Sequence, residues 1–140
     1  MGFIRGLDSK ARRRLAFAAQ SEDARERDVL VRGAEGHAQA ILRERTHWAD
    51  SLALLLQAGA AATPREPARA QSLLESAEAG FTRGDMALYA TAARRRRGEL
   101  MGDEAGRDLV AAADTWMTGQ GIKNPERMTA MLAPGRWRAD

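Results

Sequence analysis

The sequence contains no cysteine, which excludes disulfide bonds and thiolate metal sites. It has only two histidines, His37 and His47, and no His-Glu-x-x-His pattern joins them. A protein zinc site needs at least three side-chain ligands, so two isolated histidines do not indicate one. We expect His37 to pack on a helix face with Leu30, Ala34 and Ile41 and His47 to lie at the surface, and we expect no metal or other cofactor.

Aromatic residues are few, at 5%, and the β-branched residues that favour strands are sparse. The apolar positions are mostly Ala and Leu, which are strong helix formers, as are Arg and Glu. No apolar run approaches the roughly 18 to 20 residues of a membrane span, and residues 1–7 are too short for a secretory signal. The composition therefore predicts an all-α, cytoplasmic protein with a single domain over residues 1–140.

The motifs of familiar enzyme classes are also missing. The chain has no Gly-rich phosphate loop, no Gly-Lys-Ser/Thr, no His-Arg-Asp and no Asp-Phe-Gly. None of its serines stands in a Gly-x-Ser-x-Gly turn. Carboxylates are so abundant that a pair of them gives no signal for acid–base catalysis. We expect a protein without enzymatic activity.

Residues that start and stop helices are well marked. Thr63–Glu66 fits a capping box with proline at the first helical position, and Asn124-Pro125 is a second cap-then-proline start. Gly84-Asp85 and Gly102-Asp103 each place a glycine stop before an aspartate start. These marks and the apolar spacing predict seven helices, at about 8–20, 22–44, 46–62, 65–82, 85–101, 104–119 and 125–133.

Two of the predicted helix pairs resemble each other. A shift of 34 residues aligns Ala53-Leu54-Leu55 with Ala87-Leu88-Tyr89, and a shift of 36 aligns Leu73-Leu74 with Leu109-Val110. Paired helices at this period resemble tetratricopeptide repeats, although the full pattern of large residues is not met. We expect antiparallel helix pairs stacked as a tetratricopeptide-like right-handed array, and the alternative is an unrelated helix bundle.

Most of the chain resembles the C-terminal helical tail of large bacterial serine/threonine kinases that also carry an ATPase module and tetratricopeptide-like repeats. The stretches that carry this resemblance are Trp48–Gly59, Asp85–Leu100, Ala113–Met117, Gly119–Met128 and Met131–Gly135. In that family the tail is a non-catalytic scaffold, and the kinase and ATPase motifs are missing here. The resemblance therefore implies a protein–protein interaction or assembly module in signalling, not a kinase.

The net charge is only +3, because 19 acidic residues are interleaved with 22 basic ones. The basic run Arg94–Arg97 covers about 300° of a helix circumference, so it does not form one flat patch. We expect Arg94 and Arg95 to face water, with Glu99 pairing with Arg95. Nucleic-acid binding would require Arg12–Arg14 to join this run, and it is the alternative function that the mixed charge does not favour.

Arg96 differs from its neighbours because it shares a helix face with Tyr89 and Leu100. One interpretation is a structural ion pair with Asp114, which lies in line with the apolar face of the next helix. The other is that Arg96, together with Tyr89 and Arg97, lines a concave groove that binds a protein partner. The sequence leaves both open.

The two ends of the chain differ in how their apolar residues are covered. The short last helix places Met128, Met131 and Leu132 on one side, and we expect it to dock on the preceding helix pair as a cap. The first helix has apolar residues on more than one face and no cap before it. We expect a homodimer, or a complex with another protein, joined through residues 3–19. The predicted interface residues are Phe3, Ile4, Leu7, Leu15 and Phe17. The alternative is a monomer in which residues 3–7 fold back over the first helix.

Overall fold

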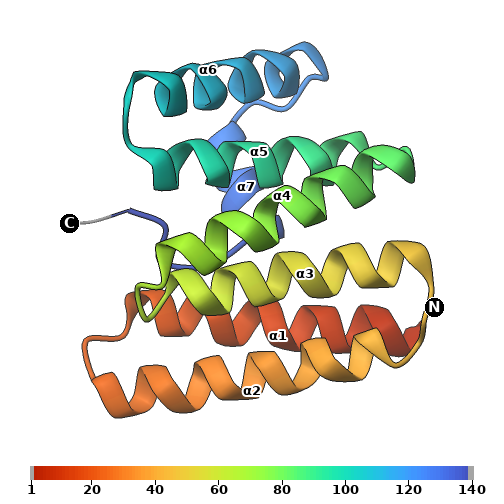
Figure 1. The fold of residues 1–140 in the computed structure, drawn as a ribbon, viewed down its shortest axis with the longest axis vertical. Coiled ribbons are helices and arrows are strands. Elements are labelled where there is room, and N and C mark those ends of the chain that lie inside the picture. Colours follow the sequence, from red (N-terminus) through yellow and green to blue (C-terminus); the bar gives the residue numbers. More distant parts are fainter. Residues whose placement is uncertain (1, 139–140) are drawn as a thin grey trace.

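The computed structural model describes residues 2–138, which form seven α-helices and no strand (Figure 1). The prediction of an all-α protein is confirmed for these residues. The first helix begins at Gly2, so residues 3–7 extend it and do not fold back over it. The helices are α1 (Gly2–Gln20), α2 (Ala24–Leu42), α3 (His47–Ala62), α4 (Pro67–Arg83), α5 (Ala87–Met101), α6 (Glu104–Gly119) and α7 (Pro125–Leu132).

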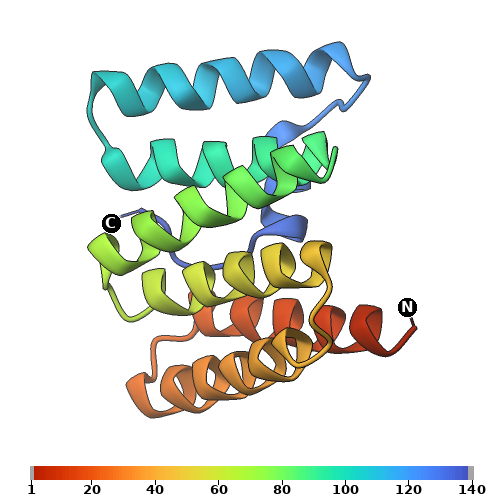
Figure 2. The ribbon, with the colours of Figure 1, turned by 45° about the vertical axis from the view of Figure 1, so that its right-hand side comes forward.

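Each of the first six helices packs against the next one in the chain, and α1 also contacts α3. Short connections make these neighbours antiparallel. The result is a stack that runs from α1 and α2 at one end to α6 at the other (Figures 1 and 2). The short helix α7 lies across this stack, where it contacts α1, α5 and α6. The first and the last helix of the chain are therefore in contact.

The two helix pairs that the sequence aligns bury corresponding residues. Ala77 of α4 and Ala113 of α6 are fully buried, and so are Phe81 and Met117 one turn further along. The larger core extends from Ile4 of α1 to the residues after α7, and a smaller one joins α5, α6 and α7. The spacing of apolar residues thus predicts which faces of these helices are buried.

The helix ends confirm some of the predicted caps and correct others. The side chains of Asp103 and Asn124 accept hydrogen bonds from the first turns of α6 and α7, as expected. The capping box at Thr63 is wrong, because the Thr63 hydroxyl donates back to the Gly59 carbonyl and closes α3. Pro67, not Pro64, is the first residue of α4. Asp85 does not cap α5, since its own backbone is left-handed, at φ 57°.

Two glycines bring α5 and α6 close together. A Cβ atom on Gly98 would lie 2.5 Å from the carbonyl oxygen of Gly106, and one on Gly106 would lie 2.4 Å from that of Gly98. Neither contact is possible for a real side chain, so the helices cross at this distance only because both residues are glycine. The crossing brings Arg95 of α5 beside Asp114 of α6.

Helix α7 docks as predicted, but not with all the predicted residues. Leu132 is buried and Met128 is half-buried, whereas Met131 is 55% exposed. The backbone carbonyl of Met131 accepts a hydrogen bond from Arg12 of α1, at 2.9 Å. The short helix therefore covers part of α5 and α6 and also contacts the first helix of the chain.

The glycine crossing can be tested by adding a single methyl group. Gly98→Ala forces α5 and α6 apart, and we expect it to lower the free energy of unfolding by about 1–3 kcal/mol. Gly36→Ala is the control, because a Cβ atom there meets nothing within 4 Å and alanine favours the helix. We expect the control to raise the free energy of unfolding by about 0.5–1 kcal/mol. Urea unfolding measures both, and equal effects would contradict the crossing.

Candidate functional site

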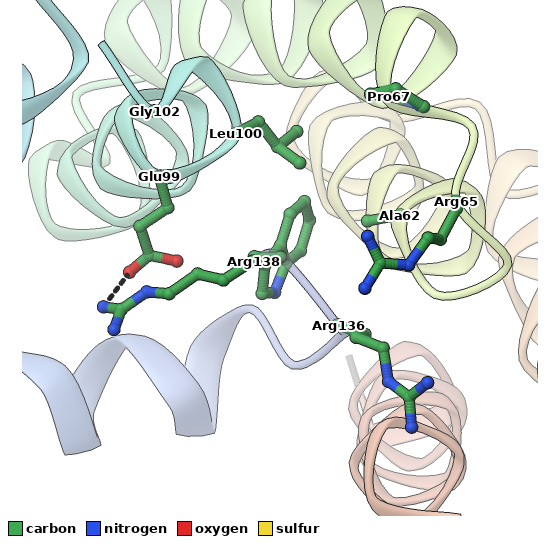
Figure 3. A pocket seen from close by; sticks show the side chains of 9 residues that line it. Ala62, Arg65, Pro67, Glu99, Leu100, Gly102, Arg136 and Arg138 are labelled. Carbon is green, nitrogen blue, oxygen red and sulfur yellow. Dashed lines mark hydrogen bonds and ion pairs between the residues drawn. The ribbon is translucent and has the colours of Figure 1, made fainter. Parts of the chain in front are cut away.

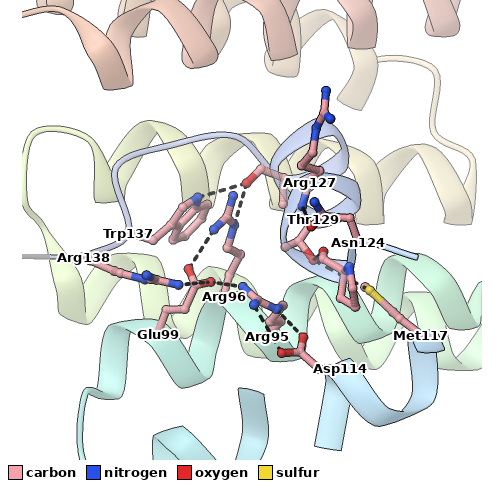
Figure 4. Close-up of polar contacts among 12 residues, drawn as sticks. Arg95, Arg96, Glu99, Asp114, Met117, Asn124, Arg127, Thr129, Trp137 and Arg138 are labelled. Carbon is pink, nitrogen blue, oxygen red and sulfur yellow. Dashed lines mark hydrogen bonds and ion pairs between the residues drawn. The ribbon is translucent and has the colours of Figure 1, made fainter. Parts of the chain in front are cut away.

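The chain after α7, residues 133–138, forms what we call the C-terminal segment. It runs across α3 and α5, and its Trp137 is buried (Figure 4). The carbonyl of Ala133 accepts two hydrogen bonds, one from Nε of Arg96 at 2.8 Å and one from the indole of Trp137 at 2.9 Å. Gly59 of α3 makes room for the segment, because a Cβ atom there would lie 2.4 Å from the Pro134 carbonyl oxygen.

Arg136 ties the C-terminal segment to the far end of α1. Its guanidinium donates to the carbonyl oxygen of Ala19, at 3.0 Å from Nη2, and to that of Ser21, at 3.1 Å. These carbonyls are at the end of α1, where the helix dipole favours a cation. The backbone N–H of Arg136 donates to the Thr63 hydroxyl beyond the end of α3. The segment therefore joins α1, α3 and α5.

Glu99 is the carboxylate at the centre of this region. Its side chain is only 2% exposed, and it pairs with Arg95, with Arg96 at 2.7 Å and with Arg138 at 3.4 Å (Figure 4). Arg95 also pairs with Asp114, at 2.7 Å. A buried carboxylate is stable only when charged donors compensate for its lost hydration, and three guanidinium groups do so here.

The predicted ion pair between Arg96 and Asp114 is wrong. Arg95 is the partner of Asp114, while Arg96 points to Glu99 and lies under the ring of Trp137, 5.3 Å from its centroid. The prediction also placed Arg95 in water, but this residue is 4% exposed. The cause is that α6 and the C-terminal segment cover the sides of α5 that carry Arg95 and Arg96, whereas the side chain of Arg94 is 36% exposed.

The surroundings change the proton affinities of the two buried arginines in opposite directions. Burial opposes the charge of Arg95, but the hydrogen bond with Asp114 and the charges of Glu99 and Asp114 outweigh it and raise its pKa. Burial lowers the pKa of Arg96, and the charges of Arg95 and Arg138 lower it further, against the effect of Glu99. Burial is thus the main cause of the lowered pKa of Arg96, and the attraction of Glu99 does not offset it.

The other predicted partner-binding residues also make internal contacts. Arg97 pairs with Glu78 of α4 at 2.7 Å, and Arg94 pairs with the same carboxylate at 3.0 Å. The ring of Tyr89 stacks on Phe81, with 5.2 Å between the ring centroids. All four arginines of the run are thus engaged by carboxylates of their own chain. Tyr89, Arg96 and Arg97 do not line an open groove together.

A cavity of about 600 Å³ lies where the C-terminal segment passes the ends of α3 and α5 (Figure 3). Its walls combine three arginines with apolar side chains and the carboxylate already described. The lining residues are Ala62, Arg65, Pro67, Glu99, Leu100, Gly102, Arg136, Trp137 and Arg138. A cavity of this size is in the range of small-molecule sites.

The predicted interface on α1 separates into two groups. Ile4 and Leu15 are buried in the chain's own core and are not free to contact a partner, whereas Leu7 is only half-buried against that core. Phe3 and Phe17 are 62% and 60% exposed. An exposed phenylalanine is unfavourable in water, and two on one helix leave an apolar surface without a cover within residues 2–138.

Sequence reasoning missed the C-terminal segment, which organises this region. The sequence does carry a signal for this segment, because a tryptophan between two arginines follows Pro134-Gly135. Tryptophan is mostly buried in proteins, so its presence there indicates a segment that packs on the helices and not a loose tail. Within residues 2–138, the structure places no three His, Asp or Glu side chains together as a metal site. No helix in the same range is both long enough and apolar enough to cross a membrane.

The Glu99 network leads to a stability prediction. Glu99→Gln leaves Arg95 and Arg96 buried without their shared carboxylate, and we expect it to lower the free energy of unfolding by about 3 kcal/mol. Asp28→Asn is the control, because Asp28 and its partner Arg32 are both exposed and such pairs contribute less than about 1 kcal/mol. Thermal and urea unfolding measure the difference. Equal stability of the two variants would show that Glu99 does not hold this region together.

Comparisons with known protein families, with curated proteins and with solved structures find no match for this chain.

Proposed function

We propose that this protein is a non-catalytic protein-interaction module and that it binds its partner through the outer face of α1. The single observation that carries the proposal is the exposure of Phe3 and Phe17 on this helix. They are 14 residues apart, which places them on the same side of the helix and about 21 Å from each other. Lys10 is exposed between them. A partner helix of ordinary length spans both phenylalanines.

The position of α1 in the stack supports this choice. Helix α1 packs against α2 and α3 and also contacts α7, and no helix within residues 2–138 covers Phe3 and Phe17. In stacked repeats each helix pair is covered by the next, so a terminal pair exposes apolar side chains unless a cap or a partner covers them. The proposal thus includes a tetratricopeptide-like stacking and a role as the scaffold tail of a kinase-type signalling protein.

The charge on α1 favours an acidic partner over a second copy. Arg5, Lys10 and Arg13 are exposed, and Asp8, the only acidic residue of the helix, is buried beside Arg12. Burial lowers the pKa of His37 on the adjacent α2, and the positive charges of Arg14 and Lys10 lower it further. Two such faces across a two-fold axis would bring like charges together. A homodimer therefore stays an alternative outcome of the test.

The ion pairs of the basic run weaken the case for nucleic acid. Phosphate binding needs several cations that converge on one surface. Arg94–Arg97 are held by Glu78, Glu99 and Asp114, so this run does not offer free guanidinium groups to a phosphate backbone. The exposed cations of α1 remain, and they lie between Phe3 and Phe17, which suits an amphipathic protein helix.

The proposal is tested with two synthetic amphipathic helices of about 20 residues. Both carry the same leucine face, and their polar face is either glutamate or lysine. We expect fluorescence anisotropy to show that the chain binds the acidic peptide and not the basic one. Phe3→Ser/Phe17→Ser should weaken binding at least about tenfold, because both apolar anchors are lost. Met101→Ser, at the end of α5, is the matched control for an exposed apolar residue and should bind as the unchanged chain does.

Three results would contradict the proposal. Equal binding of both peptides would show that charge does not select the partner. If light scattering shows a dimer that dissociates in the Phe3→Ser/Phe17→Ser variant, the α1 face binds a second copy of the chain. Tighter binding of duplex DNA than of the acidic peptide, with a steep loss in salt, would assign it to nucleic acid.

A further inference from the structure

The cavity beside the C-terminal segment is lined by three arginines from two separate parts of the chain. Arg65 comes from the turn between α3 and α4, and Arg136 and Arg138 come from the segment itself (Figure 3). Residues so far apart in sequence come together only because the segment folds back across the ends of α3 and α5. The cavity is therefore formed by several elements that the C-terminal segment brings together, and not by one helix.

The carboxylate in the wall, Glu99, pairs with one of these arginines, Arg138, and has no contact with Arg65 (Figure 3). Glu99 is already paired with Arg95 and Arg96, which lie behind it, and its contact with Arg138 is the longest of the three. The guanidinium of Arg136 points toward the end of α1, where it donates to the carbonyl oxygens of Ala19 and Ser21 (Figure 3).

Arg65 is the arginine of the cavity that is most available. It is exposed, and within residues 2–138 no hydrogen bond or ion pair engages its guanidinium (Figure 3). Its backbone is left-handed, with φ 69°, a conformation that costs a non-glycine residue free energy. Guanidinium groups bind carboxylates and phosphates through two parallel hydrogen bonds, so this side chain is suited to an oxyanion at the cavity mouth.

The rest of the wall is apolar. Ala62, Pro67 and Leu100 come from the ends of α3, α4 and α5, and the indole of Trp137 lies among them. A hydrated inorganic ion gains nothing from such surfaces, whereas a flat apolar group gains free energy when it leaves water against them. The cavity thus has one charged side and one apolar side.

We propose that this cavity binds a small organic oxyanion, with its carboxylate or phosphate on Arg65 and its flat apolar body against Leu100 and Trp137. The site is independent of the α1 face, since it uses other helices and another part of the surface.

The proposal is tested on the full chain with four probes that separate the two requirements. 1-Naphthyl phosphate and 1-naphthoate carry both an oxyanion and a flat apolar body, 1-naphthol lacks the charge, and inorganic phosphate lacks the apolar body. Titration is followed by NMR through the indole N–H signal of Trp137, assigned with Trp137→Phe. We expect both naphthyl anions to shift this signal and the other two probes to bind at least about tenfold more weakly.

A matched pair of variants locates the anion. Arg65→Gln removes the charge, keeps a long side chain and should weaken the binding of both naphthyl anions about tenfold, the loss of one charge-assisted contact. Arg45→Gln is the control, because Arg45 is also an exposed arginine in a turn between helices, with a left-handed backbone at φ 52°. It should bind as the unchanged chain does.

The proposal is overturned if Arg65→Gln binds like the unchanged chain, if 1-naphthol or inorganic phosphate binds as tightly as the naphthyl anions, or if the anions leave the Trp137 signal unmoved. Each of these results would show that the anions bind outside the cavity, or that only its arginine side or only its apolar side is used. The proposal is supported if Arg65→Gln loses binding while Arg45→Gln still shows the shift of the Trp137 signal.

Discussion

The interaction on which most of this structure depends is the burial of one carboxylate, that of Glu99, among three arginines. Removing a charge from water costs several kcal/mol, so Glu99 is stable there only while Arg95, Arg96 and Arg138 remain around it. Arg95 also donates a hydrogen bond to Asp114 of α6, and Arg96 donates one to the backbone of the C-terminal segment. One charged group thus fixes the position of α5 against both of its neighbours.

The fold was largely predictable, because helix formation and apolar spacing are local properties of the sequence. Seven helices, the buried faces of α4 and α6 and the caps at Asp103 and Asn124 follow from such local rules. The ion pairs were not predictable in the same way. The rotation of α5 is set by the contact between Gly98 and Gly106 and by a segment about 40 residues further along, so the sequence neighbours of Arg96 do not indicate its partner.

The same difference explains the candidate sites. Phe3 and Phe17 could be predicted from the sequence, because an excess of apolar residues on one helix can be recognised from the sequence alone. Only the structure shows that Ile4 and Leu15 of the same helix are buried and so do not belong to the exposed surface. The cavity beside Trp137 combines residues from α3, α4, α5 and the C-terminal segment, and no short pattern brings these together. A surface on one helix is therefore open to sequence reasoning, whereas a site between distant elements is not.

The contacts of α7 and the C-terminal segment with α1 also affect how the protein unfolds. An open stack of helices contacts only its neighbours, so its end pairs can detach one at a time while the rest stays folded. Here Arg12 reaches Met131 and Arg136 reaches Ala19, across 119 and 117 residues, so the first helix is held by the last part of the chain. Neither end can separate without breaking contacts at the other. The contacts of the last part of the chain with α1 thus couple distant parts of the stack, and we expect the protein to unfold in one cooperative step.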